Sequence, residues 1–552
     1  MFTDYFDQFL ILSVFGVSLN LLTGIAGQVS IAHGAFGAVG GFVAGYLSIR
    51  YGWSVVPAVL IAVPAGAIFG AMVSIPALRL GTEHLILLTL AIQTATIAVI
   101  MAIPALGGQF GLVGLPFPKI FGKTLLRPPD WVPFLAVVAS IVFLLCLAID
   151  RSPVGRVLRG IREDELATES LGKNVFGYKV AIFALTAGLA ALGGALYAFY
   201  NGIATPSLFD INLSISVIVI VIVGGSGNLL GSLCGTAFVV ASTPFFQSVI
   251  HLSADSTSSA RLIAYGLVLI AILLLRPQGL LPEGVVVRRG LRRPAEERTP
   301  AGGARRHSVA EREPRAARLA TGDRILDVRG LSKRFGGIHA VSELSFSLRC
   351  GEITGLIGPN GAGKTTVFNL LTGALKPDSG TVMLDGRDVT SWSMNRAAKA
   401  GMVRSFQDVR VFGGLTALDN VKLGAANRET AWAQLETVGL AAKAKAITSD
   451  LAFGERKLVA LARVLATGAR VVLLDEPASG IDAGWVDRML DVIESLRSPN
   501  VAICIVEHNL QVIERLADHV YFMENGSVTA EGTMEELARD ARLTEAYFGH
   551  AR

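Results

Sequence analysis

Cysteine and charge are both scarce in this sequence. The chain has four cysteines in 552 residues, and 17% of its residues are charged while 52% are hydrophobic. So few cysteines exclude a disulfide-stapled scaffold, and their wide spacing does not match a zinc motif. Because they lie in or beside apolar runs, we expect all four to be buried and unpaired: Cys146, Cys234, Cys350 and Cys504. The low charge is atypical of a soluble protein, and the length calls for at least two domains.

Long apolar runs lie before residue 280. A helix needs about 20 mostly apolar residues to cross a bilayer. This length predicts nine spans, give or take one, at 8–26, 29–48, 55–77, 85–104, 131–149, 179–200, 211–224, 229–250 and 261–275. The short seventh span ends at glycines and suits a broken or re-entrant helix. Asp4 and Asp7 precede the first run without a clear cleavage site, so we expect a retained spanning helix.

A basic, low-complexity stretch follows the apolar half. Residues 288–318 hold ten Arg against four Glu, so the net charge of +5 belongs to this stretch rather than to a nucleic-acid site. Its composition predicts a flexible tether, with contact to anionic lipid headgroups as an equal alternative. We expect domains at 1–283 and 323–552, joined by a linker at 284–322. The basic loops at 150–179 and after 276 should face the cytoplasm.

The run GLIGPNGAGKTTVFNLLTG contains a complete phosphate-binding motif. Residues 358–365 match G-x-x-x-x-G-K-[ST] between a predicted strand and a predicted helix. The glycines let backbone N–H groups surround a phosphate, Lys364 supplies a positive charge, and Thr365 offers its hydroxyl to Mg²⁺. The candidate nucleotide-binding residues are Gly358, Asn360, Gly361, Gly363, Lys364, Thr365 and Thr366.

Two carboxylates end the apolar run VVLLDEP. A buried strand rarely ends in paired acids for packing alone. We therefore expect Asp475 to hold Mg²⁺ and Glu476 to orient the attacking water. With the alternating strand and helix patterns after residue 323, these motifs predict an α/β P-loop ATPase.

From Ile325 onward the chain resembles the ABC transporter ATPases. The resemblance implies that Gln407 senses the γ-phosphate and Mg²⁺ and that His508 contacts the γ-phosphate. It implies that Phe335 stacks on adenine, with a core aromatic as the alternative, and that Asp482 in SGID communicates between paired sites.

The signature segment departs from the family pattern L-S-G-G-Q. Here it reads LAFGERKLVALAR, so Leu451 and Gly454 agree, Ala452 replaces the serine, and Glu455 stands at the glutamine position. These four residues would act on the nucleotide site of a partner chain. The lost hydroxyl removes one hydrogen bond to the partner's γ-phosphate, and the branched-chain amino acid branch of the family often has a similar form.

The apolar half resembles branched-chain amino acid permeases. The similar stretches are SLNLLTGIAGQVSIAHGAFGAVGGFVAGY, IVIVGGSGNLLGS and LLLRPQGLLP. We expect close helix packing at Gly37, Gly41 and Gly45. For three polar residues, a lining role near the pathway and plain interhelical hydrogen bonding are equally open: Asn20, Gln28 and His33.

The loop GRVLRGIREDELATESLGKN resembles the coupling helix of importer permeases. Ala167 and Gly172 match the pattern E-A-A-x-x-x-G, while Glu165 is shifted by one place. The segment is expected to form one short amphipathic helix with Leu166, Ser170 and Leu171 near one side. An ordinary basic loop is the alternative.

Together the two resemblances, to a LivM-like permease and a LivG-like ATP-binding protein, imply a multi-pass importer subunit in the bacterial cytoplasmic membrane. Its cofactors would be ATP and Mg²⁺, and its cargo branched-chain or related small amino acids. Its partners would be a second, non-identical permease and ATPase, an extracytoplasmic binding protein and membrane lipid, but no nucleic acid. Alternatives are a homodimer, a cargo of urea, short amides or aromatic acids, an exporter, and a non-transport mechanical module.

Overall fold

The computed structural model describes residues 2–78, 82–120, 123–126, 128–246, 254–283 and 322–540. The chain forms two compact units, the first of residues 1–162 and 175–302 and the second of residues 163–174 and 303–552. The predicted linker at 284–322 lies, except for Gly322, outside the described residues.

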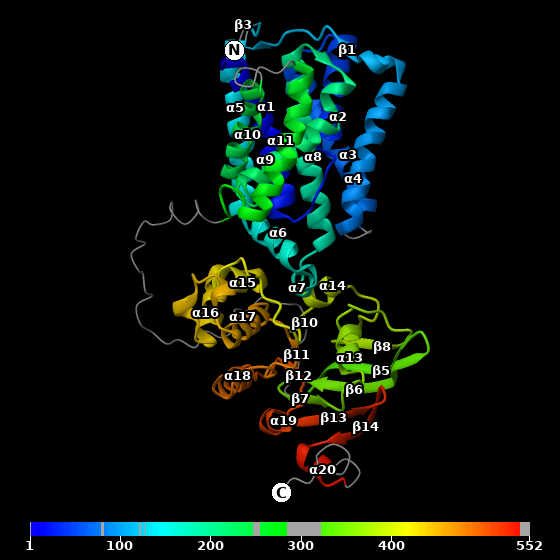
Figure 1. Cartoon of the computed structure of the whole chain (residues 1–552). Helices are drawn as coiled ribbons and strands as arrows, with labels where there is room; N and C mark the ends of the chain where they lie inside the picture. The colour runs from blue at the N-terminus through cyan, green and yellow to red at the C-terminus, as the bar shows by residue number, and fades with distance from the viewer. Residues whose placement is uncertain are drawn as a thin grey trace. The chain divides into compact units, whose positions relative to one another are not determined.

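Long apolar helices make up the first unit (Figure 1). They are α1 (Phe2–Leu19), continued by the π-helix η1 (Asn20–Ile25), α2 (His33–Tyr51), α3 (Val55–Ala77), α4 (Thr82–Ala102), α5 (Pro128–Arg151), α8 (Val175–Asn201), α9 (Ile211–Gly224), α10 (Leu229–Pro244) and α11 (Ala254–Leu275). In the described part of the chain, six segments are long and apolar enough to cross a membrane. The predicted polytopic helical fold is confirmed, but the count of nine spans is not.

Short elements connect these helices. They are η2 (Pro104–Leu106), η3 (Gly108–Phe110), β1 (Leu112–Val113), β2 (Lys119–Ile120), β3 (Lys123–Thr124), α6 (Pro153–Glu163), β4 (Ile203–Ala204) and η4 (Pro206–Phe209). Strands β1 and β4 pair antiparallel, as do β2 and β3.

Glycines let α2 and α8 pack closely. A Cβ atom added at Gly40 would lie 2.0 Å from the carbonyl oxygen of Ala191, and one added at Gly194 would lie 2.0 Å from that of Gly37. One at Gly41 would meet the ring of Phe209 at 2.7 Å. Alanine does not fit at such contacts. Gly41, a member of the predicted repeat, therefore packs closely as expected, and Gly40 and Gly194, which are outside the repeat, do so as well.

Two predictions for this half are wrong in detail. The second helix starts at His33 rather than at residue 29. The charged loop forms two helices, α6 and α7 (Glu165–Ser170), because Asp164 is extended between them and its carboxylate caps α7 by accepting a bond from Ala167 N–H at 2.8 Å. Leu166 is exposed, whereas Ala167 is fully buried. Because Ser170 and Leu171 are buried, Leu166 does not share one side of α7 with them as predicted.

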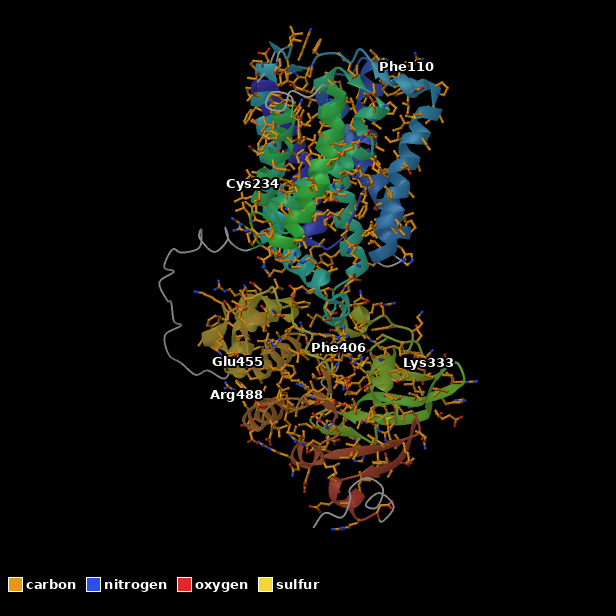
Figure 2. The ribbon with its side chains drawn as sticks, viewed as in Figure 1. Phe110, Cys234, Lys333, Phe406, Glu455 and Arg488 are labelled. Atoms are coloured by element: carbon orange, nitrogen blue, oxygen red, sulfur yellow. The ribbon has the colours of Figure 1, made fainter. Side chains whose placement is uncertain are left out.

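The cysteine prediction is also wrong at one position. Cys146, Cys350 and Cys504 are buried, but Cys234 is exposed on the outside of the first unit (Figure 2). All four are free thiols. A thiol is apolar enough to face lipid as well as a protein core, so burial does not follow from an apolar neighbourhood.

Two sheets form the frame of the second unit. One is antiparallel in the order β6-β5-β8-β9, and the other has the order β10-β11-β12-β7-β13-β14, in which only β14 is antiparallel. The strands are β5 (Arg324–Phe335), β6 (Ile338–Arg349), β7 (Ile353–Ile357), β8 (Ser379–Leu384), β9 (Arg387–Asp388), β10 (Met402–Arg404), β11 (Val471–Asp475), β12 (Ala502–Val506), β13 (His519–Glu524) and β14 (Ser527–Gly532). Strands β7, β11 and β12 are buried along their whole length, as expected for apolar runs inside a parallel sheet.

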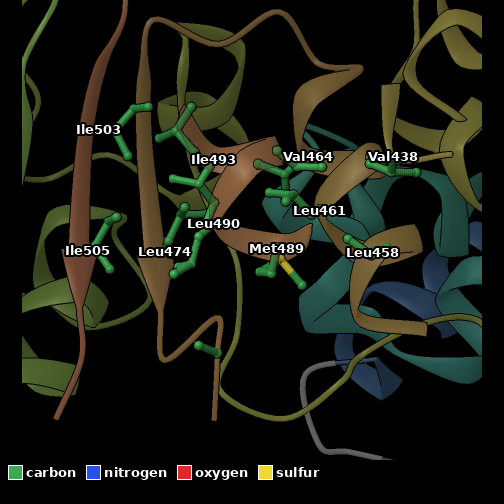
Figure 3. Packing of buried hydrophobic residues seen from close by; sticks show 14 of the residues in the cluster. Val438, Leu458, Leu461, Val464, Leu474, Met489, Leu490, Ile493, Ile503 and Ile505 are labelled. Atoms are coloured by element: carbon green, nitrogen blue, oxygen red, sulfur yellow. The ribbon is translucent and has the colours of Figure 1, made fainter. Parts of the chain in front are cut away.

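Helices complete the predicted α/β fold. They are α13 (Lys364–Leu371), α14 (Met394–Lys399), α15 (Ala417–Gly424), α16 (Arg428–Thr437), α17 (Phe453–Leu465), α18 (Ala483–Ser495), α19 (Leu510–Leu516) and α20 (Met534–Ala538), with turns η6 (Ala441–Lys443) and η7 (Thr448–Asp450). Figure 3 shows Leu458 and Leu461 of α17 in one core cluster with Leu474 of β11 and Ile493 of α18. This packing fixes the signature helix to the strand that ends in the paired carboxylates.

Candidate functional site

The parallel strand order brings four functional loops to one edge of the sheet. Strands β10, β11, β12 and β7 are neighbours, and each is followed by a polar segment. In an open α/β sheet, ligands bind outside the carboxyl ends of such strands. The segments that begin at Ser405, Glu476, Glu507 and Gly358 therefore form one candidate site.

The loop after β7 has a backbone that only glycine can adopt easily. Gly358 and Gly363 have φ angles of 150° and 98°. Added Cβ atoms would approach the carbonyl oxygens of Met523 and Ala340 at 2.1 and 2.3 Å. The motif glycines are thus required by the path of the loop and by its close contact with neighbouring backbone.

Lys364, the first residue of α13, turns back over this loop. Its Nζ donates hydrogen bonds to the carbonyl oxygens of Gly358 at 2.7 Å and Pro359 at 3.0 Å. Burial lowers the pKa of this lysine, while Glu476 and Asp475 act to raise it. Thr365 and Asn360 are exposed beside it, and Thr366 is half-buried. The lysine is a nearly buried cation suited to bind phosphate oxygens.

Three loops meet at the carboxylate of Glu476. Gln407 Nε2 donates a hydrogen bond to Glu476 Oε2 at 3.0 Å, and His508 Nδ1 lies 3.9 Å from the same oxygen. Glu476 has a φ angle of 45°, uncommon for a non-glycine residue, and its N–H donates to the carbonyl of Val506. The turn therefore directs this side chain toward the loops after β10 and β12.

Asp475 lies at the end of β11 and is almost fully buried. Arg404 Nη2 lies 3.3 Å from Asp475 Oδ2, while Oδ1 has no hydrogen-bond partner among the described residues. Burial raises the pKa of this carboxyl to about 6, although Arg404 acts to lower it. A buried carboxylate oxygen without a donor fits a hard cation such as Mg²⁺. Thr365 and Gln407 supply the other oxygen groups expected for it.

Two buried charges at the site were missed by the sequence analysis. Lys457 of α17 donates hydrogen bonds to the carbonyl oxygens of Glu476 at 3.2 Å and Pro477 at 3.3 Å, and also to that of Ser479. Glu507, after β12, accepts a bond from Ala478 N–H at 2.8 Å. Burial lowers the pKa of the lysine and raises that of the glutamate. Together they hold the turn after Glu476 from two sides.

The signature segment begins α17. Ala452 is the exposed N-cap residue, and its N–H donates to Glu455 Oε2 at 3.2 Å, so the glutamate closes the helix start although the serine is missing. Gly454 is required, because a Cβ atom there would lie 2.7 Å from the ring of Trp485. Leu451 is buried. The exposed position of residue 452 suits contact with another molecule.

Phe335 ends β5 and is 47% exposed. The alternative of a core aromatic is therefore wrong. Lys333 Nζ lies 5.9 Å from the centre of its ring. An exposed aromatic face at this strand end is free of core contacts that would compete with stacking on a base.

The segment that resembles a coupling helix lies inside the second unit. Arg410 Nη1 donates to Asp164 Oδ2 at 3.0 Å, and Gly414 N–H donates to the carboxylate of Glu163 at 3.1 Å. Gly172 has a φ angle of 78° and packs against Lys399 of α14. Glu165 is exposed and Ala167 buried. The two acidic residues before α7 thus contact the loop between β10 and α15, whereas Gly172 after α7 packs against α14.

That loop is connected to the signature helix by Arg463. This arginine of α17 is buried, and its Nη2 donates to the carbonyl oxygen of Arg410 at 2.6 Å. Its guanidinium lies 4.7 Å from the ring centre of Phe412. Burial lowers its pKa to about 10. The loop between β10 and α15 therefore touches both α7 and α17.

In the first unit, Asn20 has the interhelical role. Its Nδ2 donates to Asn228 O at 2.8 Å and to Ser232 Oγ at 2.7 Å, and its Oδ1 accepts from Gly227 N–H at 2.8 Å. These bonds hold the turn between α9 and α10. Gln28 is buried and donates to Ala26 O at 3.4 Å.

Each half of the chain matches a known protein family. Residues 1–275 match the family described as branched-chain amino acid transport system, permease component, and residues 341–479 match the family described as ABC transporter. A crystal structure of a nucleotide-free ATP-binding cassette from an ABC transporter is 29% identical and covers 41% of this chain and 100% of its own, with a TM-score of 0.39.

Curated relatives point to the same family. The high-affinity branched-chain amino acid transport ATP-binding protein LivG of Salmonella typhimurium is 36% identical over 253 residues, which are 41% of this chain and 98% of that protein. BraF of Pseudomonas aeruginosa, with the same description, is 35% identical over 251 residues, again 41% and 98%. The second unit is thus an ATPase cassette, and the first places the protein in the cytoplasmic membrane as a multi-pass permease. The chain belongs to the branched-chain amino acid ABC transporter family, with permease and ATPase in one polypeptide.

Proposed function

We propose that this chain is an ATP-driven importer subunit for branched-chain or related small amino acids that receives its solute from an extracytoplasmic binding protein. The observation that carries the proposal is the combination of a branched-chain amino acid permease domain with the site where Gln407, Glu476 and His508 converge. The domain boundaries that we propose are residues 1–283, 284–322 and 323–552.

At the nucleotide site, we assign phosphate binding to the loop after β7. Lys364 would exchange its bonds to the loop carbonyls for bonds to β- and γ-phosphate oxygens, aided by N–H groups at Gly361 and Gly363. Phe335 would stack on adenine. Asn360 and Thr366 would complete the contacts to the phosphates.

Glu476 is the residue that we assign to the attacking water. Its carboxylate would accept a hydrogen bond from the water and increase its nucleophilicity, and His508 would donate to the γ-phosphate. Gln407 would leave the carboxylate when the water arrives. Asp475, Thr365 and Gln407 would hold Mg²⁺, which neutralises charge on the β- and γ-phosphates.

The family works as a complex with further permease and ATPase subunits, and here we propose non-identical ones, with a homodimer as the alternative. The exposed signature residue Ala452, with Leu451, Gly454 and Glu455 behind it, would face the nucleotide bound to the partner ATPase. Since alanine cannot donate a hydrogen bond, the partner's site would lose about 1–3 kcal/mol of stabilisation relative to serine. In a homodimer both nucleotide sites would lack this hydroxyl, whereas a non-identical partner could supply a serine to the site of this chain.

Coupling between the two halves is assigned to α7 with Glu165, Ala167 and Gly172. Its contacts through Asp164 and Glu163 reach the loop that carries Gln407, so movement on ATP binding would be passed to the permease through this segment. A binding protein on the other face of the membrane would supply the solute.

Uptake by proteoliposomes tests the proposal. The full chain, its partner subunits and its binding protein are reconstituted with ATP enclosed, and labelled leucine, urea, acetamide and benzoate are offered outside. We expect uptake of leucine that requires both ATP and the binding protein. Uptake of urea, acetamide or benzoate without leucine would make the cargo alternative correct. ATP-dependent loss of leucine from proteoliposomes loaded with it would indicate an exporter.

A further inference from the structure

Helix α2 starts in the interior of the first unit. Residues 26–32 before it are not helical, and Ala26, Ser30 and Ala32 are 1% exposed or less. The neighbours of the helix start are Gln93, in the middle of α4 (Thr82–Ala102), and Ser214, inside α9 (Ile211–Gly224). Non-helical backbone at membrane depth is tolerated only where protein buries it or where it lines a pathway.

Side chains from other helices cover the first N–H groups of α2. Gly34 N–H donates to Ser214 Oγ at 2.9 Å, and Ala35 N–H donates to Gln93 Oε1 at 2.6 Å. Ser214 also donates to Gln93 Oε1 at 3.1 Å, so one amide oxygen accepts two bonds. A helix of 19 residues thus presents its positive end to neutral oxygen atoms.

His33, the first residue of α2, provides the second observation. Its side chain is 1% exposed, and neither ring nitrogen has a hydrogen-bond partner among the described residues. The imidazole makes an edge contact with the ring of Phe36 in the first turn of α2, with 5.9 Å between the ring centres, so it lies beside the start of this helix. An unpaired buried polar group costs about 1–3 kcal/mol, so this histidine has bonding capacity that a ligand could use.

We propose that the start of α2 is an intramembrane site for the carboxylate group of the transported amino acid. A carboxylate would take the bonds of Gly34 and Ala35 N–H that Ser214 and Gln93 now accept, and it would gain a donor from His33. A charged acceptor forms stronger hydrogen bonds than a neutral oxygen, and the helix dipole favours the negative charge.

The inference rests on the proposed function and narrows the cargo to solutes that carry a carboxylate. The site suits a solute with a carboxylate and gives no advantage to urea or a short amide, which are neutral. When no solute is present, Gln93 and Ser214 accept the hydrogen bonds of the N–H groups at the start of α2. The binding protein would set affinity, and this site would admit the acid group during passage.

Gln93→Glu tests the site with little change in shape. The glutamate keeps an oxygen for Ala35 N–H but places a fixed negative charge where the carboxylate would bind, and it loses the donor that contacts Phe209 O at 2.8 Å. In the reconstituted full complex, we expect the leucine moved per ATP hydrolysed to fall at least tenfold. The Vmax of leucine uptake should fall, while the KM for leucine stays nearly unchanged. The matched control is Thr94→Ala, the next residue on α4, which is exposed and donates to carbonyls of its own helix.

A second variant separates a binding role from a folding role. His33→Gln preserves a polar side chain of similar reach and should lower the same ratio, with normal amounts of protein in the membrane; it decides the question if Gln93→Glu does not fold. Wild-type ratios in the variant that folds would overturn the site. If the wild-type complex moves urea but no amino acid, the proposed function fails first, and the carboxylate site fails with it.

Discussion

The side-chain amide of Gln407 donates a 3.0 Å hydrogen bond to Glu476, on the carboxylate oxygen that also lies 3.9 Å from His508 Nδ1. The loops after β10, β11 and β12 therefore meet on one atom. While this bond exists, that oxygen is occupied by an amide, so Gln407 must move before the carboxylate can use it to accept a proton from water.

Replacing Gln407 should impair chemistry more than affinity. For Gln407→Ala we expect kcat for ATP hydrolysis to fall about 10- to 100-fold, less than the loss of a general acid or base typically costs, because the water and metal lose a positioning group. Steady-state ATPase measurements on the complex check this. Gln511→Ala, at an exposed position in α19, serves as the control. A wild-type kcat for Gln407→Ala would show that the amide has no role in the reaction.

Lys457 should act as a positioning residue. Lys457→Met leaves the carbonyls of Glu476, Pro477 and Ser479 without their donor, a cost of about 1–3 kcal/mol that lets the turn move. We expect kcat to fall about tenfold with KM for ATP nearly unchanged, and Lys457→Arg to recover part of the loss. Lys422→Met, which breaks a surface pair with Asp419, is the control. Equal kcat values for Lys457→Met and the control would exclude the positioning role.

Asp475 predicts a pH dependence of folding stability. Its pKa in the folded protein is raised from 3.8 to about 6 by burial, so the folded state holds the proton more tightly than the unfolded state. This contribution to stability is present below pH 3.8 and is lost as the pH rises through about 6. Relative to Asp475→Asn, the wild type should lose about 1.4 kcal/mol per pH unit over that interval.

Denaturant unfolding of the nucleotide-free and metal-free protein between pH 4 and about 8 measures the difference. The two proteins should converge in slope above pH 7, where the aspartate is ionised in both states. Parallel curves across the whole range would mean that the buried carboxyl titrates normally.

The pair of Asp164 and Arg410 should affect coupling. Asp164→Asn removes the charge but keeps an oxygen to cap α7, because asparagine is as good an N-cap as aspartate. A partly exposed pair is worth about 0.2–1 kcal/mol, so we expect solute moved per ATP to fall about two- to fivefold. Asp487→Asn breaks a comparable pair with Arg515 at 2.9 Å and is the control. No change in the ratio for Asp164→Asn would remove this pair from the coupling path.

The fold class and the main elements of the cassette could be predicted because local patterns determine them. The spacing of Gly358, Gly363 and Lys364 fixes a loop between a strand and a helix, and the apolar run before Asp475 fixes a buried strand. Residues such as Lys457, Glu507 and Arg404 could not be found this way. Their partners are backbone carbonyls, one N–H group and one carboxylate at distant positions, and nothing in their own neighbourhood indicates a role.

In the membrane half, hydropathy alone does not predict where a helix begins. Hydropathy counts apolar residues but does not say whether they are helical. It therefore predicts a second span from residue 29, whereas α2 starts at His33. The stretch before it is stabilised by contacts to α4, such as the bond from Ile31 N–H to Thr89 Oγ1 at 3.1 Å. Such long-range contacts exist only in the folded unit.

Accumulation of labelled leucine in ATP-loaded proteoliposomes measures whether hydrolysis at this chain's own site drives amino-acid import. The wild-type complex should raise internal leucine above the outside concentration when the binding protein is present. The same complex with Glu476→Gln should bind ATP but accumulate no leucine. Equal accumulation by the wild type and Glu476→Gln would mean that hydrolysis at this chain's own site does not drive import.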